Sequence, residues 1–212
     1  DNLFHVAADY RLWVPDPETM YDININGTRA LIMAAHQEGI KRIIYTSSVA
    51  ALGLNPDGSP ANEETISDIS AITGYYKRSK YLAEQIVKQL TDEHHLPLTI
   101  VNPSAPVGPG DIRPTPTGRI ILDTLLDRMP AYVNTGLNIA HVDDIAYGHL
   151  LAYQNGKPGE RYILGGDDMT LLQILQAIDE IQGVKKNRIS IPISVMLPMA
   201  WCMEKIASLT HS

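Results

Sequence analysis

The chain has 212 residues, a formal net charge of -7 and an apolar content of 44%. This composition is typical of a globular protein with one sizeable core and room for a small second lobe. The acidic balance and the lack of a basic run argue against nucleic acid as a partner. A single cysteine, Cys202, excludes an internal disulfide and favours a reducing, cytoplasmic location.

The two ends of the sequence suggest a piece of a longer protein. The chain begins with Asp1 inside an apolar run, and residues 206–212 follow a helical pattern without a terminating signal. Residues 189–203 are apolar, but Pro192 and Pro198 interrupt them, and a membrane span needs roughly 20 apolar residues in succession. We therefore expect no membrane span and interpret this segment as a docking helix rather than a membrane-surface anchor.

Apolar runs and helical patterns alternate along the first half of the chain. The expected strands are residues 3–8, buried on both faces, 42–48 and 98–102. The expected helices are residues of about 18–38, closed by Gly39, and of about 75–94. This alternation predicts βαβ units, a parallel sheet with right-handed crossovers, and ligands bound beyond the carboxyl ends of its strands.

The second half begins with an irregular, proline-rich segment after Ser104. Beyond it we expect three helices and a strand at 161–164. The first helix covers residues of about 117–128. The second runs to Tyr153 with Asp143 or Asp144 as its cap, and the third covers about 171–182 with Thr170 as its cap. These elements predict a smaller lobe built over the sheet. We expect residues 1–104 to belong to the sheet domain and 105–212 mostly to the lobe, with 131–155 returning to the sheet.

Tyr76 and Lys80 lie four residues apart on the second expected helix, so they share a face. A free tyrosine titrates near roughly pH 10, and a neighbouring ammonium favours the phenolate, so we expect Lys80 to lower the pKa of Tyr76. Such a tyrosine can exchange a proton with a carbinol or carbonyl oxygen. A Tyr-x-x-x-Lys pattern also recurs on ordinary helices, so the rest of the chain has to support this hypothesis.

Five motifs resemble, in order and spacing, the extended branch of the short-chain dehydrogenase/reductase superfamily, the NAD-dependent epimerases and dehydratases. They are His5-Val6-Ala7-Ala8, Asn24-x-Asn26-Gly27-Thr28, Thr46-Ser47-Ser48, Tyr76-Lys77-Arg78-Ser79-Lys80 and His141-Val142-Asp143-Asp144. Within that branch, residues 7–13 and 108–118 are similar to the dihydroflavonol-reductase-like group and, inside it, to the hopanoid-associated sugar epimerases. The resemblance extends over residues of about 2 to 183.

The resemblance implies a Rossmann-type, doubly wound parallel α/β sheet with a small α/β C-terminal substrate lobe. It also implies NAD or NADP as cofactor, a small-molecule substrate and a homodimer. The family opens with strands and a Gly-rich turn that holds the cofactor's pyrophosphate, and no Gly-x-Gly-x-x-Gly pattern occurs in this sequence. We therefore expect the N-terminal strands and the C-terminal end of the family's chain to be missing here.

The same resemblance implies roles for individual residues. Tyr76 would be the general acid/base, Lys80 would lower its pKa and hold the nicotinamide ribose, and Ser48, rather than Ser47, would bind the reacting oxygen. Asn24 would support Lys80 through water or backbone contacts. The remaining expected site residues are Ala7, Ala8, Pro103 and Ser104 against the cofactor, and Asp9, Tyr10, Trp13 and Asn102 toward the substrate. Asp9, Tyr10 and Trp13 fit a plain surface loop equally well.

The implied function is that of an NAD(P)-dependent oxidoreductase or epimerase acting on a secondary alcohol or ketone. A sugar or nucleotide-sugar epimerase using Ser48, Tyr76 and Lys80 is the first expectation, and a dihydroflavonol-4-reductase-like ketone reductase using NADPH is the alternative. A non-catalytic nucleotide-binding or interaction protein, or an inactive fragment, is the alternative from another class. We expect no metal site, because His5 and His141 have no further ligands at metal spacing.

Overall fold

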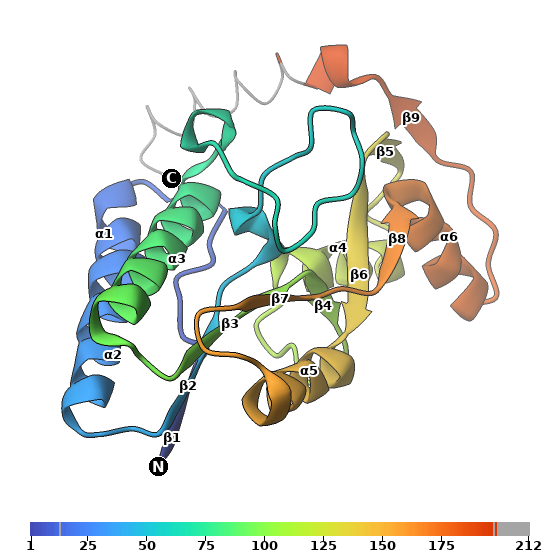
Figure 1. Cartoon of the computed structure of the whole chain (residues 1–212). Helices are drawn as coiled ribbons and strands as arrows, with labels where there is room; N and C mark the ends of the chain where they lie inside the picture. The colour runs from blue at the N-terminus through green and yellow to red at the C-terminus, as the bar shows by residue number, and fades with distance from the viewer. Residues whose placement is uncertain (13, 197, 199–212) are drawn as a thin grey trace. The chain divides into compact units, whose positions relative to one another are not determined.

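The structure is a computed structural model that describes residues 1–12, 14–196 and 198 (Figure 1). Its contacts divide the chain into two compact units. The first unit contains Asp1–Ser104 and Asp143–Gly165, and the second contains Ala105–Val142 and the chain from Gly166 onward. The backbone therefore passes from one unit to the other after Ser104, after Val142 and after Gly165.

The first unit is built on a four-stranded parallel sheet. Its strands, in spatial order, are β1 (Asn2–His5), β2 (Arg42–Thr46), β3 (Leu98–Pro103) and β7 (Arg161–Leu164). All six residues of β3 are buried, as expected for an inner strand of a parallel sheet. The parallel α/β architecture predicted from the sequence is confirmed.

Alternate residues of β2 point to opposite faces of this sheet, and each face has its own helices. Ile43 and Tyr45 pack in the core that α2 (Thr28–Gln37) and α3 (Tyr75–His94) help to form. Ile44 packs on the other face with Val101 and with Ala152 of α5 (Val142–Asn155). Strands that are covered on both faces are apolar throughout, which explains the continuous apolar run of β2.

The helix expected at about 18–38 is continuous but not regular. It consists of α1 (Pro17–Tyr21), the π-helical segment η1 (Asp22–Gly27) and α2, and it lies beside α3 in Figure 1. Asp16 caps it by accepting from the Glu18 N–H, and Gly39 ends it with a φ of +64°. A π-helical turn widens the helix locally, and such turns are frequent at functional sites.

Two boundaries differ from those expected. β1 ends at His5, and Phe4 and Val6 are 39% and 61% exposed, so residues 3–8 are not a strand buried on both faces. Among the described strands β1 has a neighbour on one side only, which leaves its outer residues open. Of residues 131–155, the part from Asp143 onward, which is α5, belongs to the first unit together with β7, which pairs with β3, whereas residues 131–142 belong to the second unit.

Up to Ile191, the second unit contains two small sheets and two helices, and helical residues follow at 193–196. Its elements are β4 (Ala105–Val107), α4 (Pro116–Leu125), β5 (Ala131–Val133), β6 (Gly136–His141), β8 (Asp167–Thr170), α6 (Leu171–Ile181) and β9 (Ile189–Ile191). β6 pairs with β4 in parallel and with β8 in antiparallel, while β5 pairs with β9. The predicted cap of α6 is confirmed, since Thr170 and Gln173 form a reciprocal capping box.

Two short 3₁₀ turns, η2 (Val49–Ala51) and η3 (Ile69–Ala71), complete the first unit. Asp143 and Asp144 lie within the first turn of α5 rather than before it, where a carboxylate still interacts favourably with the helix dipole. No helix of the described ranges has both the length and the apolar character that crossing a bilayer requires. Of the segment 189–203, residues 197 and 199–203 lie outside the described ranges.

Candidate active site

The candidate site lies where the carboxyl end of β2 meets the first turns of α3. Gly74 precedes α3 with a φ of +88°, a conformation that strains any residue with a side chain, and so lets the chain turn sharply into the helix. Tyr76, Lys80 and Glu84 then follow at intervals of four residues and share one helix face. Lys80 and Glu84 are 3% and 1% exposed, which is rare for charged side chains.

Lys80 is directed at the end of β2. Its Nζ donates a hydrogen bond to the Thr46 carbonyl oxygen at 2.8 Å and lies 5.2 Å from the centre of the Tyr45 ring. Burial lowers the pKa of Lys80 to about 8, while the charge of Glu84 acts in the opposite direction. Lys80 is therefore still mostly an ammonium at neutral pH, and only one of its three N–H donors is used by Thr46.

The pKa of Tyr76 moves in the opposite direction to the one expected. Burial raises the pKa of the phenol, and a hydrogen bond from the Ser48 side chain only partly offsets this effect. The expected lowering of the Tyr76 pKa by Lys80 is not found, because the ammonium contacts the Thr46 carbonyl and the Tyr45 ring instead. A phenol held in its protonated form is suited to donating a proton.

The two serines at the end of β2 have different environments. Ser47 is buried, and its hydroxyl donates to Glu84 Oε2 at 2.6 Å. Ser48 is half-buried; its Oγ accepts from the Ala50 N–H at 3.1 Å, which leaves the hydroxyl hydrogen for Tyr76 or a substrate oxygen. This arrangement favours Ser48 over Ser47 as the reactive partner of Tyr76.

Asn24 lies in the π-helical segment η1 and is 2% exposed. Its Oδ1 accepts from the Asp9 N–H at 2.7 Å, and its Nδ2 donates to the Asp9 carbonyl and to Ser79 Oγ, both at 2.9 Å. Ser79 in turn donates to the Tyr76 carbonyl at 2.8 Å. Asn24 thus ties the segment after β1 to the helical turn that carries Tyr76, through Ser79 rather than through Lys80 itself.

The residues expected near a cofactor lie at the carboxyl ends of β1 and β3. Ala7 is exposed, Ala8 is half-buried, and Pro103 and Ser104 are buried. Ser104 Oγ has no hydrogen-bond partner among the described residues, and a buried orphan hydroxyl fits a polar ligand at this edge. With the remaining donors of Lys80, these side chains fit the nicotinamide-ribose end of NAD or NADP.

The residues expected toward the substrate are only partly in a position to reach one. Asn102 is fully buried, and its Nδ2 donates to the Ser48 carbonyl at 3.0 Å and to Glu84 Oε2 at 2.8 Å, so its role is internal. Asp9 is held in an ion pair with Arg11 at 2.5 Å. Tyr10 is 46% exposed, and Trp13 lies outside the described residues.

The histidines considered as ligands do not form a metal centre in the described part of the chain, where no group of three or more ligating side chains occurs. His5 is buried, with Nε2 2.9 Å from Thr28 Oγ1. Burial, and then the charge of Lys80, lower the pKa of His5, so its ring is neutral at physiological pH.

Glu84 and Arg161 are the site residues that the sequence reasoning missed. Glu84 Oε1 lies 3.1 Å from Arg161 Nη1, and Arg161 also donates to the Thr65 carbonyl at 2.8 Å. A signal existed for Glu84, since an acid four residues after Lys80 falls on the buried face of the predicted helix. No such signal existed for Arg161, because its partner is 77 residues away in the sequence.

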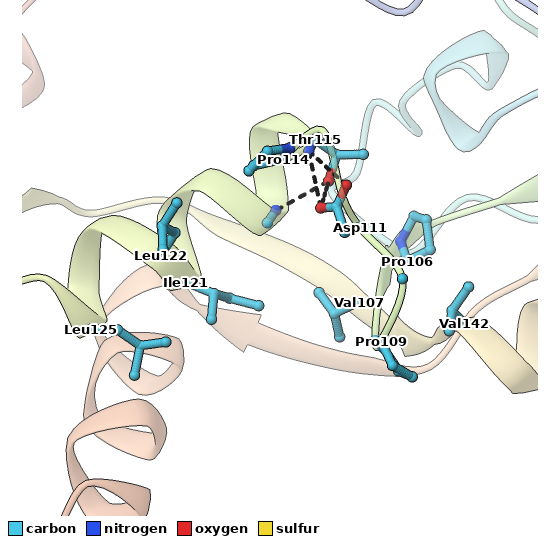
Figure 2. Close-up of a pocket in the computed structure, with 13 residues that line it drawn as sticks. Pro106, Val107, Pro109, Asp111, Pro114, Thr115, Ile121, Leu122, Leu125 and Val142 are labelled. Carbon is cyan, nitrogen blue, oxygen red and sulfur yellow. Dashed lines mark hydrogen bonds between the residues drawn. The ribbon is translucent and has the colours of Figure 1, made fainter.

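The second unit contains a cavity of about 500 Å³ between the segment that follows β4 and the helix α4. Figure 2 shows Asp111 hydrogen-bonded to Thr115 at the start of α4, with Ile121, Leu122 and Leu125 further along the helix. The other lining residues are Pro106, Val107, Gly108, Pro109, Gly110, Pro114, Gly118 and Val142. None of these described lining residues is a lysine, arginine or histidine, so the cavity suits an apolar group better than a phosphate.

A second cavity, of about 750 Å³, lies in the first unit beside the candidate catalytic residues. Val49 and Ala50, which follow Ser48, and Lys77, which follows Tyr76, are among its lining residues. Its described lining has two carboxylates, Glu64 and Asp68, against the single cation Lys77. This balance of charge does not favour an anionic ligand either.

Comparison with known proteins identifies the family. The model of the NAD dependent epimerase/dehydratase family matches residues 1–165. The chain belongs to this family. The crystal structure of gox2253 shares 56% sequence identity and a TM-score of 0.88, over 97% of this chain and 62% of that one. The expected resemblance to extended short-chain dehydrogenases/reductases and the Rossmann-type fold are thereby confirmed.

Two curated relatives extend this comparison. A Synechocystis sp. protein provisionally named dihydroflavonol 4-reductase is 48% identical over 96% of this chain. Sterol demethylase protein B of Methylococcus capsulatus is 38% identical over 94% of it. The chain spans 60% of the length of each of these relatives. The likeness to the dihydroflavonol-reductase group expected from the sequence is therefore supported.

Proposed function

We propose that this protein is an NAD(P)-dependent oxidoreductase that interconverts a secondary alcohol and a ketone through Ser48, Tyr76 and Lys80. The observation that carries the proposal is the placement of these three side chains at one strand end, with Tyr76 protonated and paired to Ser48 and with Lys80 charged beside them. Membership of the NAD dependent epimerase/dehydratase family supports the same assignment.

The nicotinamide cofactor, when bound, supplies the hydride chemistry. In the direction of reduction, the Ser48 hydroxyl donates a hydrogen bond to the ketone oxygen, and Tyr76 transfers its phenolic proton to that oxygen. Lys80 would hold the ribose of the cofactor with the N–H donors that Thr46 leaves unused, rather than lower the pKa of Tyr76. Asn24, through Ser79, fixes the helical turn on which this proton transfer depends.

The function has two subclasses, a ketone reductase and a nucleotide-sugar epimerase, and the charges that line the cavities favour the reductase. A nucleotide-sugar epimerase needs cationic or backbone groups for a diphosphate, and the described linings of the two cavities contain one cation, Lys77. An apolar ketone needs no such charge, which suits the cavity beside Ser48 and Tyr76, where Lys77 is the single cation of the described lining. The names of the two curated relatives refer to a dihydroflavonol and to a sterol, and neither refers to a sugar. We therefore propose a ketone reductase in preference to the epimerase.

The decisive variant is Tyr76→Phe, measured by oxidation of NADPH in the presence of 2-acetonaphthone, an uncharged apolar ketone. We expect kcat to fall by roughly 10²- to 10⁴-fold, because the proton donor is removed while the ring is kept. Tyr75→Phe is the matched control, since Tyr75 is the preceding residue and packs on Tyr21. Its kcat should change by less than about twofold. Equal turnover by the wild-type protein and Tyr76→Phe would contradict the proposed function.

The same preparation decides between the two subclasses. Net consumption of NADPH with 2-acetonaphthone supports the reductase. Conversion of UDP-glucose to an epimer without net consumption of NADPH would instead support the epimerase, and Tyr76→Phe should abolish that conversion as well.

A further inference from the structure

Glu84 connects the candidate catalytic helix to the ends of two strands. Its Oε2 accepts from Ser47 Oγ at 2.6 Å and from Asn102 Nδ2 at 2.8 Å. Its Oε1 lies 3.1 Å from both Lys88 Nζ and Arg161 Nη1. The carboxylate is 1% exposed, and its contacts come from Ser47, which directly follows β2, and from β3, β7 and α3.

These contacts fix the backbone on both sides of the Ser48 α-carbon. Ser47, which precedes it, is held by its hydroxyl, and the carbonyl of Ser48 accepts from the same Asn102 amide that binds Glu84. A side chain whose flanking peptide groups are both anchored has few alternative positions. The direction in which Ser48 presents its hydroxyl therefore depends on a carboxylate that does not itself contact Ser48 Oγ.

The charge of Glu84 also acts on Lys80, one helical turn away. It opposes the effect of burial on the Lys80 pKa, and the other titratable groups around that ammonium are His5 from β1 and Tyr45 from β2. Burial by itself would raise the pKa of Glu84, but hydrogen bonds from Ser47 and Asn102 and the charge of Lys88 outweigh it. Glu84 is therefore a permanent negative charge beside Lys80 at neutral pH.

We propose that Glu84 is a positioning residue for the reaction proposed above: it orients Ser48 through Ser47 and Asn102, and it places a negative charge one helical turn from the Lys80 ammonium. The proposal rests on the proposed function, because it assigns Glu84 a role in that site. It distinguishes Glu84 from a carboxylate that only stabilises the fold through Arg161 and Lys88.

Kinetics of three variants of the full-length protein, with NADPH and 2-acetonaphthone, test the orienting role. Glu84→Gln and Asn102→Ala should each lower kcat by roughly 10- to 100-fold with KM nearly unchanged, because Ser48 loses its orientation. Lys88→Met is the matched control: Lys88 contacts the same carboxylate, is partly exposed and makes no contact with Ser48. Its kcat should stay within about twofold of wild type. An equal loss of kcat in Lys88→Met and Glu84→Gln would overturn the orienting role.

The effect on Lys80 is measured without turnover, by NMR titration of protein labelled with ¹³C at lysine Cε, with Lys80→Met to assign the signal. The wild-type resonance should titrate near the pKa of about 8, and Glu84→Gln should move it to lower pH. The alkaline limb of the kcat profile should move in the same direction. An unchanged Lys80 titration in folded Glu84→Gln would overturn this part of the proposal.

The outcomes separate this proposal from the proposed function. If Tyr76→Phe leaves turnover unchanged, the proposed function fails, while the NMR titration still decides whether Glu84 controls Lys80. If Tyr76→Phe abolishes turnover but Asn102→Ala does not lower it, only the orienting role fails. If Glu84→Gln does not fold, Ser47→Ala and Asn102→Ala carry the test, since both keep the ion pairs of Glu84 with Arg161 and Lys88.

Discussion

Lys80 illustrates how burial decides the chemistry of a single residue. A lysine this deeply buried is costly to keep charged, and in the described part of the chain the Thr46 carbonyl, the Tyr45 ring and Glu84 compensate for the lost water. The proposed function gives a reason for this cost, since residues that serve catalysis often lower stability. Its pKa of about 8 makes this cost dependent on pH.

The lowered pKa of the buried Lys80 predicts how the free energy of unfolding varies with pH. The folded-state pKa is about 8 and the ordinary value is 10.5, so the unfolded chain binds more protons between these values and stability rises with pH. From pH 8 to pH 9.5 the rise due to Lys80 should be about 1 to 2 kcal/mol. Urea unfolding of wild type and Lys80→Met checks this, because the variant should lack the rise. Above pH 10 the raised pKa values of Tyr45 and Tyr76 act in the opposite direction.

Parallel slopes of stability against pH in the two proteins would show that Lys80 is not responsible. The Lys80→Met protein is also expected to be more stable than wild type at pH 7, since methionine fills a similar volume without a buried charge.

At the scale of elements, helix boundaries follow local signals, and helix irregularities follow tertiary contacts. Thr170 begins α6 with a capping box that is readable from Thr170 and Gln173 alone. The π-helical segment η1 has no such signal; it places Asn24 inward, where its amide is shared between Asp9 and Ser79. We infer that these long-range hydrogen bonds stabilise the wider helical turn.

The capping box makes Thr170→Ala a test at the scale of one element. The variant should lose about 1 kcal/mol of the free energy of unfolding, because the Gln173 N–H at the start of α6 loses its side-chain acceptor, Thr170 Oγ1. Thr135→Ala serves as control. Thr135 accepts from the Leu171 N–H through its backbone carbonyl, which alanine keeps. Its loss should stay below about 0.5 kcal/mol. Urea titrations of both variants give the comparison, and equal losses would argue against the cap as the cause.

At the scale of the whole molecule, the first unit depends on a core that lies on both faces of one sheet. Ile43 and Ile100 pack on the side of α2 and α3, and Ile44 and Val101 on the side of α5. The predicted homodimer and cytoplasmic location stay predictions. Of the side chains that α3 and the helix of residues 17–37 expose, Ile23, Leu31 and Tyr75 are apolar and would be covered if these helices formed the dimer interface.

Ile100→Ala tests the contribution of this core. Ile100 is 1% exposed and lies on β3 between β2 and β7, so the substitution should cost about 2 to 5 kcal/mol of the free energy of unfolding. Leu54→Ala, at a site that is 92% exposed in the same unit, should change it by less than about 0.5 kcal/mol. Chemical unfolding followed by circular dichroism measures both. A small loss in Ile100→Ala would mean that β3 is not central to the stability of the fold.

The sequence alone was sufficient for the parallel α/β architecture, the cap of α6 and the helix that carries both Tyr76 and Lys80. These features depend on periodicity and on residues a few positions apart, which constrain local backbone geometry directly. The assignment of the site residues to catalysis and cofactor binding stays a prediction, with Asn102 now placed inside the protein instead of toward a substrate.

Only the tertiary structure decided how these residues are used. It distinguished Ser48 from Ser47, whose hydroxyl donates to Glu84. It also placed the Lys80 ammonium against the Thr46 carbonyl and paired β7 with β3. Each of these outcomes depends on partners far apart in the chain, such as Glu84 and Arg161. Burial and hydrogen bonding set pKa values and side-chain direction, and both are properties of the packed chain that no local pattern contains.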